Sequence, residues 1–468
     1  MADSKLFLGP RLRRLRRDRG LSQTDMATSL AISPSYLNHL ERNQRPVTGA
    51  LLLRLAETYE IDVRSFAAAG ATRTGADELA EIFSDAMLSD LGVPRYELAE
   101  IALNAPSVAD AIARLYGALK EVDRNPSLAQ NGDARALVTP ENWVRDYIQQ
   151  HRNHFPELEQ SAETLGGALA DPLSVTEPLR RRLKEAWGIS ARVVAPAELG
   201  NASQAYDPER RLFLLSSLLR AENRTFGLAY QLSLVEFSGV IERMVEAAAP
   251  PDAGIRHLLH MSLANYAAGA VMMPYGRFLA SAQQHRYSID RLCGEYGANV
   301  EQVAHRLTTL GRTGARGVPF FMLRVDPAGN ISKRYAGENF PFSRFGGSCP
   351  RWNLHAAFQI AGRVITQLIE TPDGQRFFTV SRTIDRPIPT DLSGGLLAIG
   401  LGCDIKYAHR LACADGIDLS NPPVTPVGPA CAICPRVDCP HRATAPAGRM
   451  LAVEENRKTI SPYPFVSG

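Results

Sequence analysis

Residues 21–45 contain two short helix patterns joined by a tight turn, and this feature restricts the fold more than any other. In LSQTDMATSLAIS, Ser22 is a natural N-cap residue and Asp25 follows three positions later, as in a capping box. In ISPSYLNHLERNQR, Ser33 is the next cap and Pro34 takes the first helical position. Two such helices, the second polar on its outer face, predict a helix-turn-helix. Their buried stripes are expected to be Met26, Ala27, Leu30, Leu37 and Leu40.

The charge distribution separates this segment from the rest of the chain. Residues 1–50 carry nine Lys and Arg side chains against four acidic ones, a net charge of +5, whereas the whole chain has a net charge of +3. The remaining residues therefore sum to −2. A basic N-terminal unit indicates a polyanionic partner at that end, and we expect double-stranded DNA. A helical protein-interaction bundle is the alternative interpretation.

The segment LSQTDMATSLAISPSYLNHLE resembles the Xre and lambda-repressor type of helix-turn-helix, with Ala31 in place of the usual turn glycine. The resemblance implies an all-α DNA-binding domain over residues 1–68. It also implies that Gln23 contacts a phosphate and that Arg42 and Arg45 contact the DNA backbone. The side chains that it places toward the major groove are Ser35, Tyr36, Asn38 and His39.

The length of the chain requires more than one hydrophobic core. With 468 residues, of which 45% are hydrophobic, we expect two to four domains. The segment AAAGATRTGAD interrupts the helical pattern and marks a boundary. We expect a helical linker and dimerisation region over 69–125, a mixed region over 126–312 and a C-terminal sensor domain over 313–468.

No stretch approaches the roughly 18 apolar residues of a membrane span, and no signal-peptide core follows the basic N-terminus, so we expect a cytoplasmic protein. In the C-terminal region, DPAGN and TPDGQ are turn signals between alternating strands. The predicted fold class is therefore a multidomain chain in which the all-α helix-turn-helix domain precedes an α+β sensor region with an antiparallel sheet.

Three cysteines lie close together in VGPACAICPRVDCPHRA: Cys431, Cys434 and Cys439. Their spacing on a proline-stiffened turn favours a shared metal over strained disulfides. An iron-sulfur cluster, a zinc ion and thiols without metal all remain open at this point. A fourth thiolate would come best from Cys403 in LGCDI, with Cys349 as the reserve candidate, and a zinc ion could instead take His441. Two further thiols are interpreted as small buried hydrophobes: Cys293 and Cys413.

Two central segments, TFGLAYQLSLVEF and LANYAAGAVMMPYGRFL, resemble the ImmA/IrrE-like metallopeptidase module, in which an AHExxH helix precedes an ANxFAAxLLMP helix. Here the zinc-binding positions hold Tyr230 and Leu234, and the position of the general base holds Gln231. None of the three can do that chemistry, so we expect no hydrolysis by this helix and no enzymatic role. The retained scaffold predicts a small-molecule pocket, with Met272 as apolar lining. The alternative is that these residues only pack a core.

The motifs MMPYGRF, FGGSCPRWNLHAAF, LGCDIKYAHRL and CAICPRVDCPHRA together resemble the short-chain fatty acyl transcriptional regulator family, over almost the full chain. This resemblance implies a regulator of propionate, methylcitrate or glyoxylate metabolism. It implies an acyl-CoA effector and a [4Fe-4S] cluster in the C-terminal domain. Neither property follows from composition or spacing.

An acyl-CoA requires cations for its phosphates and an apolar slot for its acyl chain. By sequence, Arg277 in MMPYGRF is the best-placed cation. The further cations are Arg324, Lys333, Arg334 and Arg344, and the aromatic candidates are Tyr266, Tyr275, Phe345 and Trp352. Each of them fits equally well as a surface cation or a core aromatic.

We therefore predict a homodimeric transcription factor, because paired half-sites require paired heads. Three rivals remain: an enzymatic activity attached to a DNA-binding head, a purely redox-sensing repressor, and a zinc-stapled regulator without an iron-sulfur cluster.

Overall fold

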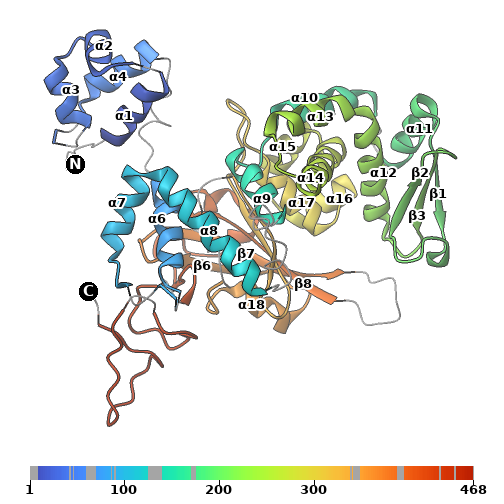
Figure 1. The fold of residues 1–468 in the computed structure, drawn as a ribbon. Coiled ribbons are helices and arrows are strands. Elements are labelled where there is room, and N and C mark those ends of the chain that lie inside the picture. Colours follow the sequence, from blue (N-terminus) through green and yellow to red (C-terminus); the bar gives the residue numbers. More distant parts are fainter. Residues whose placement is uncertain are drawn as a thin grey trace. The chain divides into compact units, whose positions relative to one another are not determined.

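The structure is a computed structural model of the chain (Figure 1). The structure describes residues 9–19, 21–41, 44–45, 47–59, 70–85, 87–88, 91–124, 140–169, 175–337, 340, 348–386, 395–431, 434–446 and 449–466. Two compact units divide the chain, the first comprising residues 1–116 and 447–449 and the second residues 117–446 and 450–468. Each unit is described by itself below.

The N-terminal helices form the predicted helix-turn-helix. They are α1 (Gly9–Asp18), α2 (Gln23–Ser29), α3 (Pro34–Glu41) and α4 (Gly49–Tyr59). The capping box is present, because the Ser22 hydroxyl accepts the Asp25 amide at 3.1 Å while the Asp25 carboxylate accepts the Ser22 amide at 3.2 Å. The turn between α2 and α3 places Ala31 at a φ of 51°, in the left-handed region that favours glycine. All the apolar residues predicted for the buried stripes are buried: Met26, Ala27, Leu30, Leu37 and Leu40.

The region after the helix-turn-helix is helical, as expected, but the prediction that AAAGATRTGAD interrupts the helical pattern is wrong, because a helix begins inside that segment at Gly70. It contains α6 (Gly70–Ile82), α7 (Arg95–Asn104) and α8 (Pro106–Arg124). Leu79 and Ile82 of α6 are buried, as are Leu98 of α7 and Ala109 of α8. The Tyr116 hydroxyl donates a hydrogen bond to the Asp85 carboxylate at 2.8 Å, which ties α8 to the end of α6.

In the second unit, a helical region surrounds the long helix α14, as Figure 1 shows. α14 packs against α9, α10, α12 and α13. The helices are α9 (Pro140–Gln150), α10 (Pro156–Ala168), α11 (Thr176–Trp187), α12 (Ala221–Glu236), α13 (Ser238–Ala248), α14 (Ala253–Met272), α15 (Tyr275–Gln284), α16 (Ile289–Tyr296) and α17 (Val300–Thr308). The short sheet beside α12 has the order β1-β3-β2, from β1 (Ser190–Val194), β2 (Gln204–Asp207) and β3 (Leu212–Ser216). β1 is parallel to β3, and β2 is antiparallel to it.

The C-terminal sheet has six strands in the order β5-β4-β8-β7-β6-β9. They are β4 (Phe321–Val325), β5 (Ile331–Ala336), β6 (Ile365–Glu370), β7 (Arg376–Arg386), β8 (Gly395–Asp404) and β9 (Val424–Pro426). Both predicted hairpins are present as β4–β5 and β6–β7, and all pairs are antiparallel except β6 with β9. The predicted fold class is thus confirmed.

Alternation along the strands sends side chains into two separate cores. One face contributes Met322, Phe378 and Leu401 to the core that it shares with the helices. The other face contributes Phe321, Leu323 and Phe377 to a smaller core closed by Trp352 and by Leu354 of α18 (Asn353–Ala356). Across the described ranges, no helix is both long and apolar enough to span a bilayer.

Candidate functional site

The recognition helix α3 presents the predicted polar face. Ser35 and His39 are exposed, and Asn38 is half-buried. The His39 ring lies against Gln44, with Nδ1 2.6 Å from the amide oxygen, and the Arg45 guanidinium lies 5.9 Å from the centre of the Tyr36 ring. Gln44 and Arg45, which follow α3, thus contact His39 and Tyr36 of the helix, while Arg42 lies outside the described residues.

Glu41 is a buried residue whose contacts with the DNA-binding helices the sequence reasoning missed. Its buried carboxylate accepts two hydrogen bonds from Arg16, at 2.6 and 3.0 Å, and a third from the Gln23 amide at 2.8 Å. Burial alone would raise the pKa of Glu41, but these hydrogen bonds outweigh it and lower the pKa. Gln23 is thereby fixed at the start of α2, where its contact with a phosphate is predicted. One signal in the sequence could have indicated this contact. A single acidic residue ends the apolar stripe of the second helix pattern, and a basic helix precedes that pattern.

The three positions of the lost peptidase site lie on α12 and are packed into the helical core. Gln231 is buried, and Tyr230 and Leu234 are partly buried against the same cluster. Burial raises the pKa of the Tyr230 hydroxyl. The side chains that stand for two histidines and a glutamate therefore act as packing residues.

A pocket of about 390 Å³ opens between the helices and the C-terminal sheet. Phe226 of α12 and Asn265 of α14 form one side, and Arg324 of β4 and Lys333 of β5 form the other. The volume lies in the range of small-molecule sites. Its other lining residues are Ile148, Asn153, Phe155, Asn223, Ser262, Leu263, Tyr266, Gly269, Asn299, Glu301, Gln302, His305 and Tyr335. The lining combines carboxamides, aromatic rings and two cations, so it is suited to a ligand with amide, apolar and anionic parts.

Both cations of this pocket are held by one carboxylate. Arg324 Nη1 and Lys333 Nζ lie 2.6 and 2.8 Å from the same oxygen of Glu301. Burial would raise the pKa of Glu301, yet the attraction of Lys333 and Arg324 lowers it. Two positive charges face one negative charge here, and the excess of positive charge favours binding of an anionic group.

His305 completes this wall of the pocket. Its ring lies 4.5 Å from the ring of Tyr335, measured between centres. Burial, with a smaller contribution from Lys333, lowers the pKa of His305 to about 3, so the imidazole is neutral at physiological pH. A neutral imidazole offers one donor and one acceptor to a ligand.

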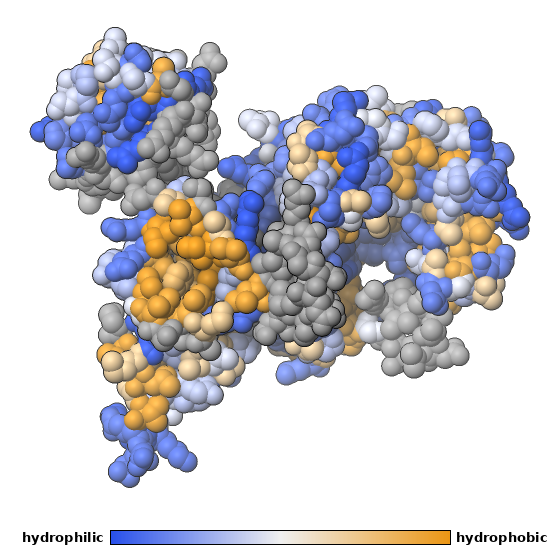
Figure 2. Space-filling view, in the orientation of Figure 1, coloured by the Kyte–Doolittle hydropathy of each residue, from blue (hydrophilic) through white to orange (hydrophobic). Residues whose placement is uncertain are grey.

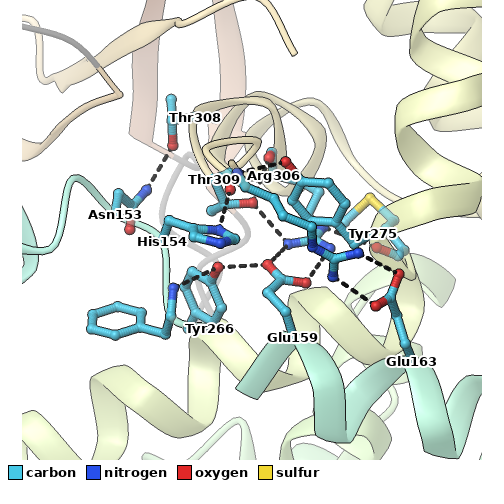
Figure 3. Close-up of polar contacts among 12 residues, drawn as sticks. Asn153, His154, Glu159, Glu163, Tyr266, Tyr275, Arg306, Thr308 and Thr309 are labelled. Carbon is cyan, nitrogen blue, oxygen red and sulfur yellow. Dashed lines mark hydrogen bonds and ion pairs between the residues drawn. The ribbon is translucent and has the colours of Figure 1, made fainter. Parts of the chain in front are cut away.

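A buried polar network, drawn in Figure 3, adjoins the pocket at Tyr266. The Tyr266 hydroxyl donates to Glu159 at 2.5 Å, and Arg306 donates to both oxygens of Glu159, at 2.5 and 2.8 Å. Arg306 also donates to the Met273 carbonyl at 2.9 Å. Burial by itself would lower the pKa of Arg306, but Glu159 raises it, so this guanidinium remains charged. The network joins α10, α14 and α17, and Tyr266 belongs both to it and to the pocket wall.

The other predicted ligand residues lie elsewhere. The helix break at Pro274 turns α15 away, so Arg277 is exposed and its guanidinium lies 5.7 Å from the Tyr296 ring. Met272 and Tyr275 are buried, and the Tyr275 hydroxyl donates to the Ala315 carbonyl at 2.9 Å. Arg334 and Trp352 do not line this pocket, and Arg344 and Phe345 lie outside the described residues. The structure thus brings Tyr266, Arg324 and Lys333 together, and not Arg277.

The cysteine cluster lines a second, narrow pocket. Cys431, Cys434 and Cys439 share it with Cys349 and His441. Burial raises the pKa of the Cys349 thiol, and the neighbouring Cys431 and Cys434 raise it further. None of the seven cysteines forms a disulfide. Among the described residues, no three His, Cys, Asp or Glu side chains stand close enough to hold one ion as they are.

Cys403 was the preferred fourth ligand by sequence, and the geometry favours the reserve candidate instead. Cys403 lies on β8 opposite Phe378 and is fully buried in the core shared with the helices. Cys349 belongs to the other core. The side chains of a strand alternate between the faces of a sheet, so Cys403 faces away from the core that contains Cys349.

Arg442 holds the backbone of the cysteine loop. Its buried guanidinium donates to the carbonyls of Cys431, Cys434 and Arg436 at 2.6, 2.8 and 2.8 Å. The loop also packs closely against Gly428, because a Cβ atom at this position would lie 2.6 Å from the Cys434 sulfur. The loop is therefore positioned through its backbone carbonyls by Arg442 and through the Cys434 sulfur by its packing against Gly428.

Comparison with known proteins agrees with this architecture. Residues 8–69 match a helix-turn-helix domain model, residues 176–308 an IrrE N-terminal-like domain model, and residues 309–463 the model of the short-chain fatty acyl coenzyme A regulator C-terminal domain. The HTH-type transcriptional regulator RamB of Mycobacterium tuberculosis is 38% identical over 98% of this chain and 99% of its own. The chain belongs to the short-chain fatty acyl coenzyme A regulator family.

Two further relatives support membership of this family. A propionyl-CoA carboxylase regulator of Cereibacter sphaeroides is 36% identical, over 99% of both chains. A solved structure of a Mycobacterium tuberculosis transcriptional regulator matches with a TM-score of 0.66 and 35% identity, covering 69% of this chain and all of the other. The RamB and PrpR relatives from Mycobacterium tuberculosis are both named HTH-type transcriptional regulators, which indicates a regulatory role for members of the family.

Proposed function

We propose that this regulator senses a short-chain acyl-CoA in the pocket between α14, α17 and the β4–β5 hairpin, and that it binds operator DNA as a homodimer. The observation that carries the proposal is the pairing of Arg324 and Lys333 with the single carboxylate of Glu301. An incoming phosphate or pyrophosphate can take over these cations, because charge-assisted hydrogen bonds to phosphate are among the strong ones in proteins.

The remaining lining suits the rest of such a ligand. The carboxamides of Asn153, Asn223 and Asn265 can pair with the amide groups of a pantetheine arm. Phe155 and Phe226 offer apolar surface to a short acyl chain. The volume supports binding of the acyl-pantetheine part inside the pocket, with the nucleotide at its mouth.

The ligand can influence DNA binding only if it favours one arrangement of the protein over another. Tyr266 offers a route, because it lines the pocket and donates to Glu159 in the network that holds α10, α14 and α17. A ligand that contacts Tyr266 would therefore bias the packing of these helices.

The test is calorimetric titration of the full chain with acetyl-CoA, propionyl-CoA, butyryl-CoA and CoA. We expect Arg324→Ala and Lys333→Ala each to weaken acyl-CoA binding by about tenfold or more. Arg277→Ala is the matched control and should bind as the wild type does, because Arg277 lies outside the pocket. Absence of acyl-CoA binding by the wild type, or a loss confined to Arg277→Ala, would contradict the proposal.

We also propose that Cys349, Cys431, Cys434 and Cys439 hold a [4Fe-4S] cluster. Four thiols lining one pocket are the donor set that such a cluster requires, and a zinc ion is the alternative occupant. The bound cluster would supply electron-transfer chemistry and hence sensitivity to redox state. The chain's part is to close the loop around the group, with Arg442 holding the loop carbonyls.

Iron, acid-labile sulfide and zinc are measured per chain after anaerobic purification. We expect about four irons and four sulfides in the wild type and in Cys403→Ala, and a loss of both in Cys349→Ala. Zinc without sulfide would support the alternative occupant. Loss of metal in Cys403→Ala but not in Cys349→Ala would overturn the ligand assignment.

A further inference from the structure

Helix α8 has apolar residues on two faces, and among the described residues only one of these faces is buried. Ala109, Ala113 and Tyr116 are buried. Val108 and Leu115, seven residues apart, are 50% and 71% exposed. A single buried stripe is what a helix at the surface of a domain needs, so the second stripe requires another explanation.

The second stripe has the spacing of a coiled-coil seam. Val108, Ala111 and Leu115 are separated by three and then four residues, and the sequence continues the pattern with Ala118 and Val122. An alternation of three and four residues is the a/d pattern by which one helix packs along another. The described part of this stripe is exposed, so no described segment of the chain covers it.

The exposed stripe is part of a larger apolar surface. Tyr96 of α7 is 68% exposed, and Met87 and Leu91 before α7 are also exposed. Figure 2 shows hydrophobic residues gathered on this face over α6, α7 and α8. Extended exposed apolar surfaces mark interaction sites in soluble proteins.

We infer that this surface, formed by Tyr96, Val108, Ala111 and Leu115, is where a second copy of the chain packs, α8 against α8. Three observations favour a second copy over another partner. The heptad spacing matches a helix of the same kind, and one two-fold contact satisfies both copies. The flanking Asp110 and Arg114 form an ion pair of opposite charges at 3.4 Å, so these two charges cancel beside the stripe. The surface belongs to the same compact unit as the helix-turn-helix, whose heads must be paired to read two half-sites.

The inference rests on the proposed dimeric state, and its test separates the two. Sedimentation velocity of the wild-type full chain at micromolar concentration measures the dimer itself. We expect Leu115→Glu and Val108→Glu each to raise the dimer Kd by about 100-fold or more. In a two-fold contact both copies use the same surface, so each variant dimer would bury two new negative charges. Met261→Glu is the control, since Met261 is 49% exposed on α14 in the other unit, and it should remain dimeric.

Circular dichroism and acyl-CoA titration of the same variants show whether the chain is still folded. Leu115→Cys provides a second measurement, since a bismaleimide should join two copies above the wild-type background when α8 packs against α8. A monomeric wild type would overturn the dimer and this inference together. Variants that stay dimeric would overturn the α8 interface and leave the dimer itself in place. If those dimeric variants also unfold more easily, the surface is covered by another part of the same chain.

Discussion

The guanidinium of Arg306 donates two hydrogen bonds to the carboxylate of Glu159, at 2.5 and 2.8 Å, and both side chains are buried. They come from α17 and α10, which are far apart in the sequence. A buried ion pair is sustained by its geometry and its other hydrogen bonds, here to Met273, Thr309 and Tyr266. It fixes the packing of α10 against α17, next to the proposed ligand pocket.

Breaking this pair on one side should be costly. We expect Glu159→Gln to lower the free energy of unfolding by about 3 to 5 kcal/mol, because it leaves the Arg306 charge buried without its partner. Replacing both residues by methionine should recover most of the loss. Urea unfolding followed by tryptophan fluorescence measures this, since Trp143, Trp187 and Trp352 all lie in the second unit. A double variant no more stable than Glu159→Gln would contradict this explanation.

The neutral imidazole of His305 should make the second unit sensitive to acid. Its folded pKa of about 3 lies below the unfolded value of about 6.5, so the unfolded chain binds the extra proton between them. Stability is therefore complete above about pH 6.5 and is lost as the pH falls toward 3. At pH 5 we expect a loss of at most about 2 kcal/mol relative to pH 7, since the ring is only half-buried. The same unfolding measurement on His305→Gln should show a smaller loss, and an equal loss would assign the effect to other groups.

The turn of the helix-turn-helix is strained at Ala31. A non-glycine residue at a φ of 51° costs about 1 to 2 kcal/mol. We expect Ala31→Gly to stabilise the domain by about 1 kcal/mol and to slow hydrogen exchange of the α2 and α3 amides about fivefold. Ala27→Gly is the matched control, and it should speed exchange because Ala27 is buried inside α2. Faster exchange in Ala31→Gly would show that no strain is relieved there.

If the proposed acyl-CoA binds in this pocket, Glu301 competes with it for Arg324 and Lys333, which it holds as ion pairs. Glu301→Gln removes the competing charge and should tighten acyl-CoA binding by about tenfold in calorimetry. Glu163→Gln serves as control, because Glu163 pairs with Arg312 and does not line the pocket. Weaker binding by Glu301→Gln would mean that the carboxylate positions the cations for the ligand and does not oppose it.

Asn38 on α3 should carry sequence information. Binding selections from a randomised DNA library should show that Asn38→Ala relaxes the base preference at one position, by about 1 to 3 kcal/mol, with an unchanged salt dependence. Thr58→Ala, an exposed substitution on α4, should leave the preference intact. A uniform loss of affinity for all sequences would assign Asn38 to the DNA backbone.

The sequence by itself determined the local elements of this protein. Ser22 and Asp25 specify the start of α2, and the turn signals DPAGN and TPDGQ specify the two hairpins, because caps and turns depend on residues a few positions apart. The replacement of the peptidase residues at Tyr230 and Gln231 also followed from the side chains alone. So did the grouping of Cys431, Cys434 and Cys439, which lie within one loop.

Only the tertiary structure decided which distant residues meet. Arg324, and not Arg277, reaches the pocket because the chain turns at Pro274 and because β4 lies beside α17. Cys349, and not Cys403, lines the pocket of the cysteine loop, because the Cys403 side chain points from β8 into the core on the other face of the sheet. The pairing of Glu159 with Arg306 spans 147 positions, so no local pattern could indicate it. Such contacts depend on strand order, on the face of each element and on helix packing, which arise only when the whole chain is folded.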